Sequence, residues 1–193
     1  MTRALKAHRD SGAGLLEALS NKLTSGTMRD FDVMRTFIAK ALLEYPAPVP
    51  RSSFPGLLHA KLMGVASGCG ENSNAVLHLC AKLLRVYRTP TSESRAWVAS
   101  IAADVIDTIE CRIYDRDDES ARDLVPLVAE GLSRQIRSAA HDGDSSLSFI
   151  GALKRLSELG DISVCAELIP CLSQMQSADD AVSLLALVAP HFP

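Results

Sequence analysis

The sequence predicts an all-α fold, and three observations support this class. Apolar residues recur at intervals of three and four through most of the chain, as they do on one face of a helix. Alternation with a period of two, which is typical of a strand, never lasts through a bounded β-branched run. Aromatic residues make up 5% of the 193 residues and hydrophobic residues 47%. The core must therefore consist mainly of Leu, Ala, Val and Ile, which favours closely packed helices over a β-sandwich.

Nine helical segments follow from this periodicity, each bounded by turn-forming residues. In 14–23 and 28–45 the apolar residues fall on one face, and the three prolines of 46–50 end the second segment because proline cannot continue a helix. Pro55 fits the first turn of the next helix, where a missing N–H costs nothing. The remaining helices are expected at 53–65, 74–87, 92–114, 121–138, 147–159, 162–176 and 178–189.

The length of the chain allows one domain with a sizeable core. We expect residues 1–13 to form a flexible N-terminus and residues 14–193 a single all-helical domain. The N-terminus is basic but lacks the apolar block of a secretory signal. No apolar run approaches the roughly 18 to 20 residues of a membrane span. These features predict a cytoplasmic protein without a membrane span, although the basic N-terminus is also compatible with specialised export.

Two prolines indicate an internal repeat. Pro126 in DLVPLV and Pro170 in ELIPCL each follow an acidic residue and two aliphatic residues, and they are 170 − 126 = 44 residues apart. IAKALLEY and CAKLLRVY align Lys40 with Lys82, 42 residues apart (82 − 40). Both spacings fit the ~40 to 47 residues of a two-helix repeat. The repeat units would be 14–45, 52–88, 121–160 and 162–193, with 92–114 as an extra element.

In these features the sequence resembles the HEAT/armadillo class, most clearly over residues 121–193. The first helix of a HEAT repeat often carries a proline after one or two aliphatic residues, as in DLVPLV and ELIPCL. The resemblance implies helical hairpins stacked as a short α-solenoid. The usual Asp and Arg positions of such repeats are not matched, since Asp144 has no following Arg. An irregular multi-helix bundle is the alternative.

No motif for catalysis or for cofactor binding is present, and we expect no catalytic, cofactor or metal site. The spacings of the one His/Cys cluster do not match a zinc finger. The D-x-D spacing in HDGD (141–144) suits a divalent cation, but a glycine-centred turn with Asp144 or Ser145 capping the next helix is simpler. The five cysteines are odd in number, form no C-x-x-C and are expected mainly as buried small hydrophobes. The zinc candidates are His59, Cys69, His78 and Cys80.

Basic residues form the most informative surface pattern. His78, Lys82 and Arg85 follow one another at steps of four and three along one predicted helix, and Arg88 extends the row. The repeat alignment places Lys40, Lys82 and Lys154 at equivalent exposed positions. In α-solenoids such helices line a concave face that commonly binds partners. A solvated face that keeps the helices soluble is the alternative. The candidate partner-binding residues are Lys40, His78, Lys82, Arg85, Arg88, Lys154 and Arg155.

The net charge of −3 provides no general field for nucleic acid or for an anionic membrane. We therefore predict a non-enzymatic adaptor or scaffold that binds another protein, one with an acidic segment suiting the basic row. Two other classes stay open. One is an effector or enzyme whose site is assembled from dispersed residues, and the other is a nucleic-acid-binding helical array that uses Lys82, Arg85 and Arg88.

Overall fold

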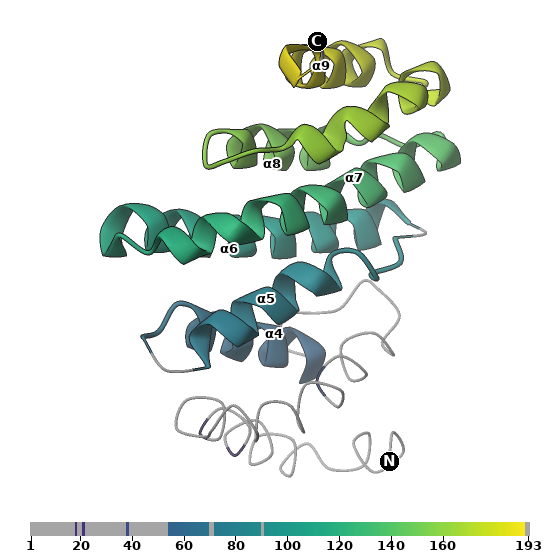
Figure 1. Ribbon diagram of the computed structural model, residues 1–193. Helices are drawn as coiled ribbons and strands as arrows, with labels where there is room; N and C mark the ends of the chain where they lie inside the picture. The colour runs from purple at the N-terminus through teal and green to yellow at the C-terminus, as the bar shows by residue number, and fades with distance from the viewer. Residues whose placement is uncertain are drawn as a thin grey trace. The chain divides into compact units, whose positions relative to one another are not determined.

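The computed structural model describes residues 54–69, 72–89 and 91–191, together with Ala18, Asn21 and Ile38. All regular secondary structure in this part of the chain is helical, and no strand is present among the described residues (Figure 1). The predicted all-α class is therefore confirmed for these residues. The expectations for 1–13, 14–23 and 28–45 fall almost wholly outside them.

Six α-helices and three 3₁₀ segments make up the described chain. Every helix predicted after residue 50 is present, with ends that differ by a few residues from those expected. One predicted helix differs in type, because residues 163–174 of the predicted 162–176 form a 3₁₀ segment. The α-helices are α4 (Phe54–Ala66), α5 (Ser73–Leu83), α6 (Ser92–Arg116), α7 (Val125–Asp142), α8 (Leu147–Ser157) and α9 (Ala178–Val188). The 3₁₀ segments are η1 (Glu119–Leu124), η2 (Ser163–Gln174) and η3 (Ala189–His191).

The chain divides into two compact units, Met1–Leu79 and Cys80–Pro193, with the boundary inside α5. The first is called unit 1 and the second unit 2. In unit 1, Leu58 and Leu62 of α4 are buried, as are Val76 and Leu77 of α5. The predicted single domain over 14–193 stays a prediction.

Within unit 2, elements two apart along the chain lie side by side. α6 packs against α8, α7 against η2, and α8 against α9 (Figure 1). The predicted extra element, 92–114, corresponds to α6, and it contacts a later helix, α8, just as α7 contacts η2. The repeat alignment set it apart since it depended on prolines, and α6 has none.

The two prolines each follow the start of a 3₁₀ segment at the same distance along the chain. Pro126 lies seven residues after the start of η1 and Pro170 seven residues after the start of η2 (126 − 119 and 170 − 163). Pro126 enters the first turn of α7, whereas Pro170 lies inside a segment that stays 3₁₀ to its end. Proline lacks an N–H and crowds the carbonyl four residues earlier. A 3₁₀ run before each proline agrees with that restriction.

α6 has well-defined ends. The Thr91 hydroxyl accepts from the backbone N–H of Ser94, and the Ser94 hydroxyl accepts from that of Thr91, which forms a capping box. At the other end Asp117 is left-handed at φ 54°, and Arg112 donates from Nε to Asp118 at 2.9 Å. Hydrogen bonds from Ser120 and from Arg112 lower the pKa of Asp118. Their contribution to stability is therefore present at neutral pH and is lost as the pH falls through this lowered pKa.

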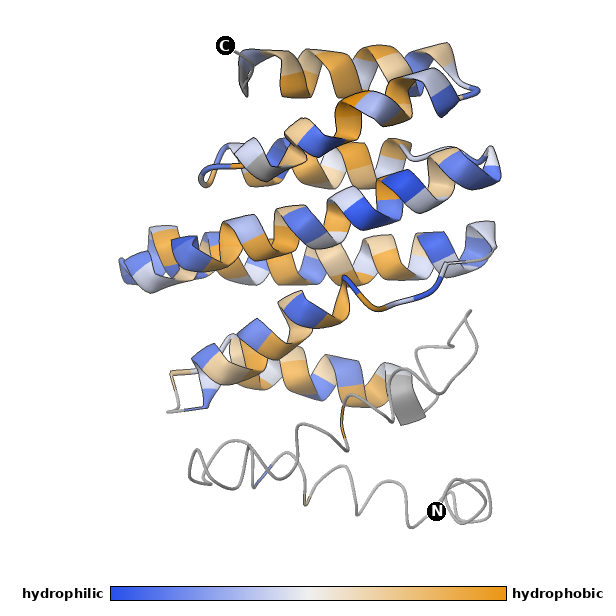
Figure 2. Cartoon of the chain, turned by 45° about the vertical axis from the view of Figure 1, so that its right-hand side comes forward, coloured by the Kyte–Doolittle hydropathy of each residue, from blue (hydrophilic) through white to orange (hydrophobic). Residues whose placement is uncertain are grey.

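The core of unit 2 is aliphatic, as the composition predicts. Ile101, Ile106 and Ile109 of α6 and Leu132 of α7 are fully buried, and Phe149 of α8 joins them. Figure 2 shows bands of apolar and polar residues along these helices. Such amphipathic helices bury one stripe against each other and leave the other stripe to water.

α7 lies unusually close to the segment that follows α5. A Cβ added to Gly131 would lie 2.8 Å from the Cβ of Leu84. Four residues along α7, the Gln135 side chain donates to the carbonyls of Leu84 at 2.8 Å and of Tyr87 at 3.1 Å. The Thr89 hydroxyl donates to Gln135 Oε1 at 2.9 Å. The glycine permits the close approach, and the buried amide satisfies the carbonyls that the approach covers.

This contact gives a stability prediction. Gly131→Ala should lower the free energy of unfolding by about 1–3 kcal/mol, because the new methyl group overpacks against Leu84. Gly151→Ala is the matched control, since a Cβ there meets nothing within 4 Å. Alanine should raise stability at that position by about 0.5–1 kcal/mol. Urea unfolding of the two variants tests this, and equal effects of the same sign would contradict it.

Candidate functional site

An open groove with a volume of about 740 Å³ runs between α8 and α9 in unit 2. One wall is α8, which contributes Leu147, Ile150 and Gly151 and, further along, Lys154 and Glu158. These positions recur at intervals of three and four, so they form one face of the helix. The other wall is α9, and its lining residues include Val182, Ala186 and Leu187, with Pro190 of η3 beyond them. The groove is thus mainly apolar, with its charges on the α8 side.

Large apolar side chains stand exposed at this groove. Leu147 is 48% exposed and Val182, on the opposite wall, 67% exposed. Leu185 on α9 is 50% exposed as well, although it does not line the groove. Exposed apolar side chains are ordinary when they occur singly. Their grouping around a concavity is typical of a binding site.

Gly151 opens the α8 wall to the groove. It lies in the middle of α8, where glycine costs roughly 0.5–1 kcal/mol relative to alanine. A Cβ at this position would meet nothing within 4 Å, in contrast to Gly131. Packing within the described chain therefore does not require a glycine here. Its effect is to leave the α8 backbone accessible from the groove.

Lys154 supplies the positive charge of the groove. It is exposed, and no ion pair joins it to another described residue. The next residue, Arg155, binds Asp107 and Glu110 of α6 at 2.6 and 2.7 Å. Of the two adjacent cations on α8, one is thus neutralised by α6 and the other borders the groove.

The other predicted binding residues lie elsewhere. His78 and Lys82 are exposed on α5, and Arg88 is exposed after it. Arg85 pairs with Glu130 of α7 at 2.7 Å, which reduces its net charge toward a partner. Lys40 lies outside the described residues. Of the seven candidates, Lys154 alone lines the groove among those the structure describes.

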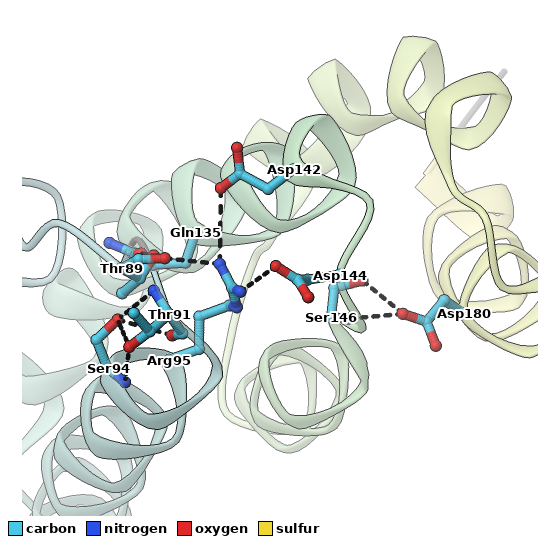
Figure 3. Close-up of polar contacts among 9 residues, drawn as sticks. All are labelled: Thr89, Thr91, Ser94, Arg95, Gln135, Asp142, Asp144, Ser146 and Asp180. Carbon is cyan, nitrogen blue, oxygen red and sulfur yellow. Dashed lines mark hydrogen bonds and ion pairs between the residues drawn. The ribbon is translucent and has the colours of Figure 1, made fainter. Parts of the chain in front are cut away.

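The D-x-D pair of HDGD binds an arginine of the protein itself (Figure 3). Buried Arg95 of α6 forms a salt bridge with Asp144 and lies 3.6 Å from Asp142. Its Nη1 also donates to the Thr89 carbonyl at 2.6 Å. The guanidinium thus takes the place that the sequence analysis considered for a divalent cation.

The predicted glycine-centred turn is confirmed, but its predicted helix cap is only partly correct. Gly143 ends α7 in the left-handed conformation at φ 73°. Asp144 does not cap α8, because its carboxylate binds Arg95. The Ser145 hydroxyl accepts from the Leu147 N–H at 3.4 Å, although Ser146 holds the N-cap position.

Asp180 sets how the two walls of the groove meet. This buried carboxylate lies in the first turn of α9. It accepts from the backbone N–H of Ser146 at 2.6 Å and from the Ser146 hydroxyl at 3.0 Å (Figure 3). A carboxylate at the N-terminus of a helix is stabilised by the helix dipole and by the unpaired N–H groups there. Asp180 therefore joins the start of α9 to the start of α8.

The four zinc candidates differ in their exposure to solvent. His59 and Cys80 are buried, whereas Cys69 and His78 are exposed. Nowhere in the described chain do three His, Cys, Asp or Glu side chains gather so that they could hold a metal ion. Burial raises the pKa of the Cys80 thiol to about 12, and burial also raises the pKa of Cys165 and Cys171.

Sequence reasoning missed the groove, because it depends on two helices about 30 residues apart in the chain. One signal was present: 181–190 (AVSLLALVAP) carries no charge. An amphipathic surface helix normally carries charged residues on its outer side. The lack of charge after the first turn of this last helix could have indicated an apolar surface.

Arg95→Met tests the contribution of the buried guanidinium. Methionine keeps most of the apolar stem but leaves the Thr89 carbonyl and two carboxylates without their donor. The free energy of unfolding should fall by about 1.5–3 kcal/mol, the range for hydrogen bonds to charged groups. The exposed Arg134 of α7 provides the control, and Arg134→Met should change stability by less than about 0.5 kcal/mol. Equal losses in the two variants would show that Arg95 makes no special contribution.

Thiol labelling tests the burial of the cysteines. Exposed Cys69 should react within the mixing time of a disulfide reagent at pH 8, and half-exposed Cys111 more slowly, because a hydrogen bond to Asp115 raises its pKa. Cys80, Cys165 and Cys171 should react only after denaturant is added. Peptide mass spectrometry would identify the labelled sites. Labelling of native Cys80 at the rate of Cys69 would contradict the structure.

No helix in the described part of the chain is long and apolar enough to cross a membrane. Comparison of the chain with protein-family models, curated proteins and solved structures found no match. The resemblance to HEAT/armadillo repeats therefore depends on the residues of this sequence alone, and the function has to be inferred from the groove.

Proposed function

We propose that this protein is a non-enzymatic adaptor or scaffold that binds another protein through a surface of stacked helical hairpins. The side-by-side packing of α6 with α8 and of α7 with η2 supports a short α-solenoid of the HEAT/armadillo kind. Stacked helices of this kind present long surfaces formed by successive elements, which suits them to hold partners.

The α8–α9 groove is the observation that carries the proposal. The groove has a mainly apolar lining, in which Leu147 and Val182 are exposed, and a lysine, Lys154, at its edge. Protein interfaces have an apolar centre with polar groups at the rim. The most strongly shifted pKa values in unit 2 belong to Cys80 and Tyr87, and burial in the core raises both. Such core groups do not form the convergent site in a cleft that an enzyme requires.

The predicted preference for an acidic partner segment is kept in this proposal, with Lys154 as its cation. The row on α5 is the competing surface. Arg85 shares its charge with Glu130, so Lys82 is the better probe of that row. The two surfaces are distinguishable by substitution, because Lys82 does not line the groove.

Affinity purification from native lysate tests the proposal, with the whole chain as bait at two salt concentrations. Leu147→Glu places a charge in the groove and should remove retained proteins that bind the wild type. Leu57→Glu is a matched control, since Leu57 lies in the first turns of α4 and is 43% exposed, close to the 48% of Leu147. Truncating or charging a central apolar contact costs about 1–2 kcal/mol or more, which is at least five- to tenfold in affinity.

Three results are decisive. Loss of the same proteins with Leu147→Glu but not with Leu57→Glu supports the groove. Loss with Lys82→Glu alone would move the binding surface to α5. Retention of no protein by any bait, at either salt concentration, would contradict the adaptor function.

A further inference from the structure

We infer that the groove between α8 and α9 receives an amphipathic α-helix of a partner protein, which places its backbone close to Gly151 and an acidic side chain beside Lys154. The inference rests on the proposed function and specifies the kind of partner.

The walls of the groove favour a helix over an extended peptide. Both walls are helices, so their backbone N–H and C=O groups are already paired and cannot bind a strand. An extended segment in an apolar groove would therefore bury its own polar backbone without partners. A helix pairs these groups internally. The eleven residues of α8 span about 16 Å, which matches about three turns of a docked helix.

Gly151 indicates how close the occupant comes. Exposed side chains stand at Leu147 and Lys154 on the α8 wall, and Gly151 is the gap between them. Helices pack with the ridges of one in the grooves of the other, at an interaxial distance set by the side chains at the contact. With no side chain at position 151 and nothing within 4 Å of an added Cβ, a ridge of the incoming helix fits there. This use explains a glycine that packing within the described chain does not require.

The charged residues of the groove determine where an acidic residue of the occupant would lie. Lys154 attracts an acidic side chain, and Arg155 does not compete for it because Asp107 and Glu110 already hold its guanidinium. Glu158 lies one turn further along the same wall and repels an acid there. The α9 wall offers only apolar residues and Ser183. The occupant therefore has an apolar face toward α9 and one acidic residue near the middle of the α8 wall.

A second copy of this chain fits less well. Its own mainly apolar helix, α9, has acidic residues only in the first turn, at Asp179 and Asp180, and Asp180 is buried against Ser146. A small apolar molecule would not use Lys154.

The test uses the whole chain and a displayed library of random peptides of about 14 residues, the length of the groove plus one turn. Peptides that bind the wild type are sequenced, synthesised and measured by fluorescence anisotropy and circular dichroism. Selected peptides should gain helicity on binding and share apolar residues at i, i+3 or i+4, and i+7, with an acidic residue beside them.

Four variants locate the binding site. Gly151→Met fills the gap and should weaken the selected peptides about tenfold or more. Lys154→Glu should weaken them about fivefold at low salt, and less as salt is added. The controls are Gly64→Met and Lys61→Glu, which place the same changes at exposed positions of α4, where Gly64 also has nothing within 4 Å of an added Cβ. Circular dichroism of each variant verifies that it folds.

Failure of this inference is distinguishable from failure of the adaptor function. Peptides that bind without gaining helicity, or that bind Gly151→Met as well as the wild type, would overturn the helical occupant even if lysate proteins are retained. Concentration-dependent dimers that Gly151→Met dissolves would assign the groove to a second copy and overturn the inference. Displacement of the peptides by a fatty acid at equal concentration would assign it to a small apolar ligand, with the same consequence.

Discussion

A buried guanidinium and a buried carboxylate hold one end of unit 2 together, and the groove depends on both. Arg95 of α6 reaches the Thr89 carbonyl and the Asp142–Asp144 turn at the end of α7. Two residues after Asp144, Ser146 is the N-cap of α8, and its N–H and hydroxyl donate to Asp180 of α9. Two sets of polar contacts, joined by the chain from Asp144 to Ser146, thus link α6 to α7 and α8 to α9 (Figure 3). They place both walls of the groove relative to the rest of the unit.

The two buried charges are tolerated for different reasons. The planar guanidinium of Arg95 serves three acceptors at once, which a lysine could not do with the same geometry. Asp142 and Asp144 remain about 40% exposed, so their desolvation is modest. Asp180 is buried, but the N–H and the hydroxyl of Ser146 at the start of α8 replace its water. Buried ion pairs add little net stability compared with apolar residues. Their effect here is to select one placement of α9 against α8.

The sequence was sufficient for features that local physics determines. The helices after residue 50 and the turn at Gly143 follow from periodicity and from the backbone limits of glycine and proline. What it could not supply depends on residues far apart in the chain. Arg95 lies 49 residues from Asp144, and nothing in either segment identifies the other as its partner. The 3₁₀ form of η2 is a further case, because an apolar run with a central proline is compatible with a kinked α-helix as well.

Two pairs of similar residues show why the groove could not be identified from the sequence alone. Gly131 and Gly151 both lie inside helices, yet a Cβ added to the first would lie 2.8 Å from Leu84 Cβ, and one added to the second would meet nothing within 4 Å. Lys154 and Arg155 are adjacent cations, yet α6 neutralises only the second. A sequence records both glycines and both cations without distinguishing them. Contacts within the protein account for Gly131 and Arg155. Of these four residues, only Gly151 and Lys154 are then left without a role inside the part of the protein that the structure describes. Both lie on the same wall of the same groove, so one docked partner explains both.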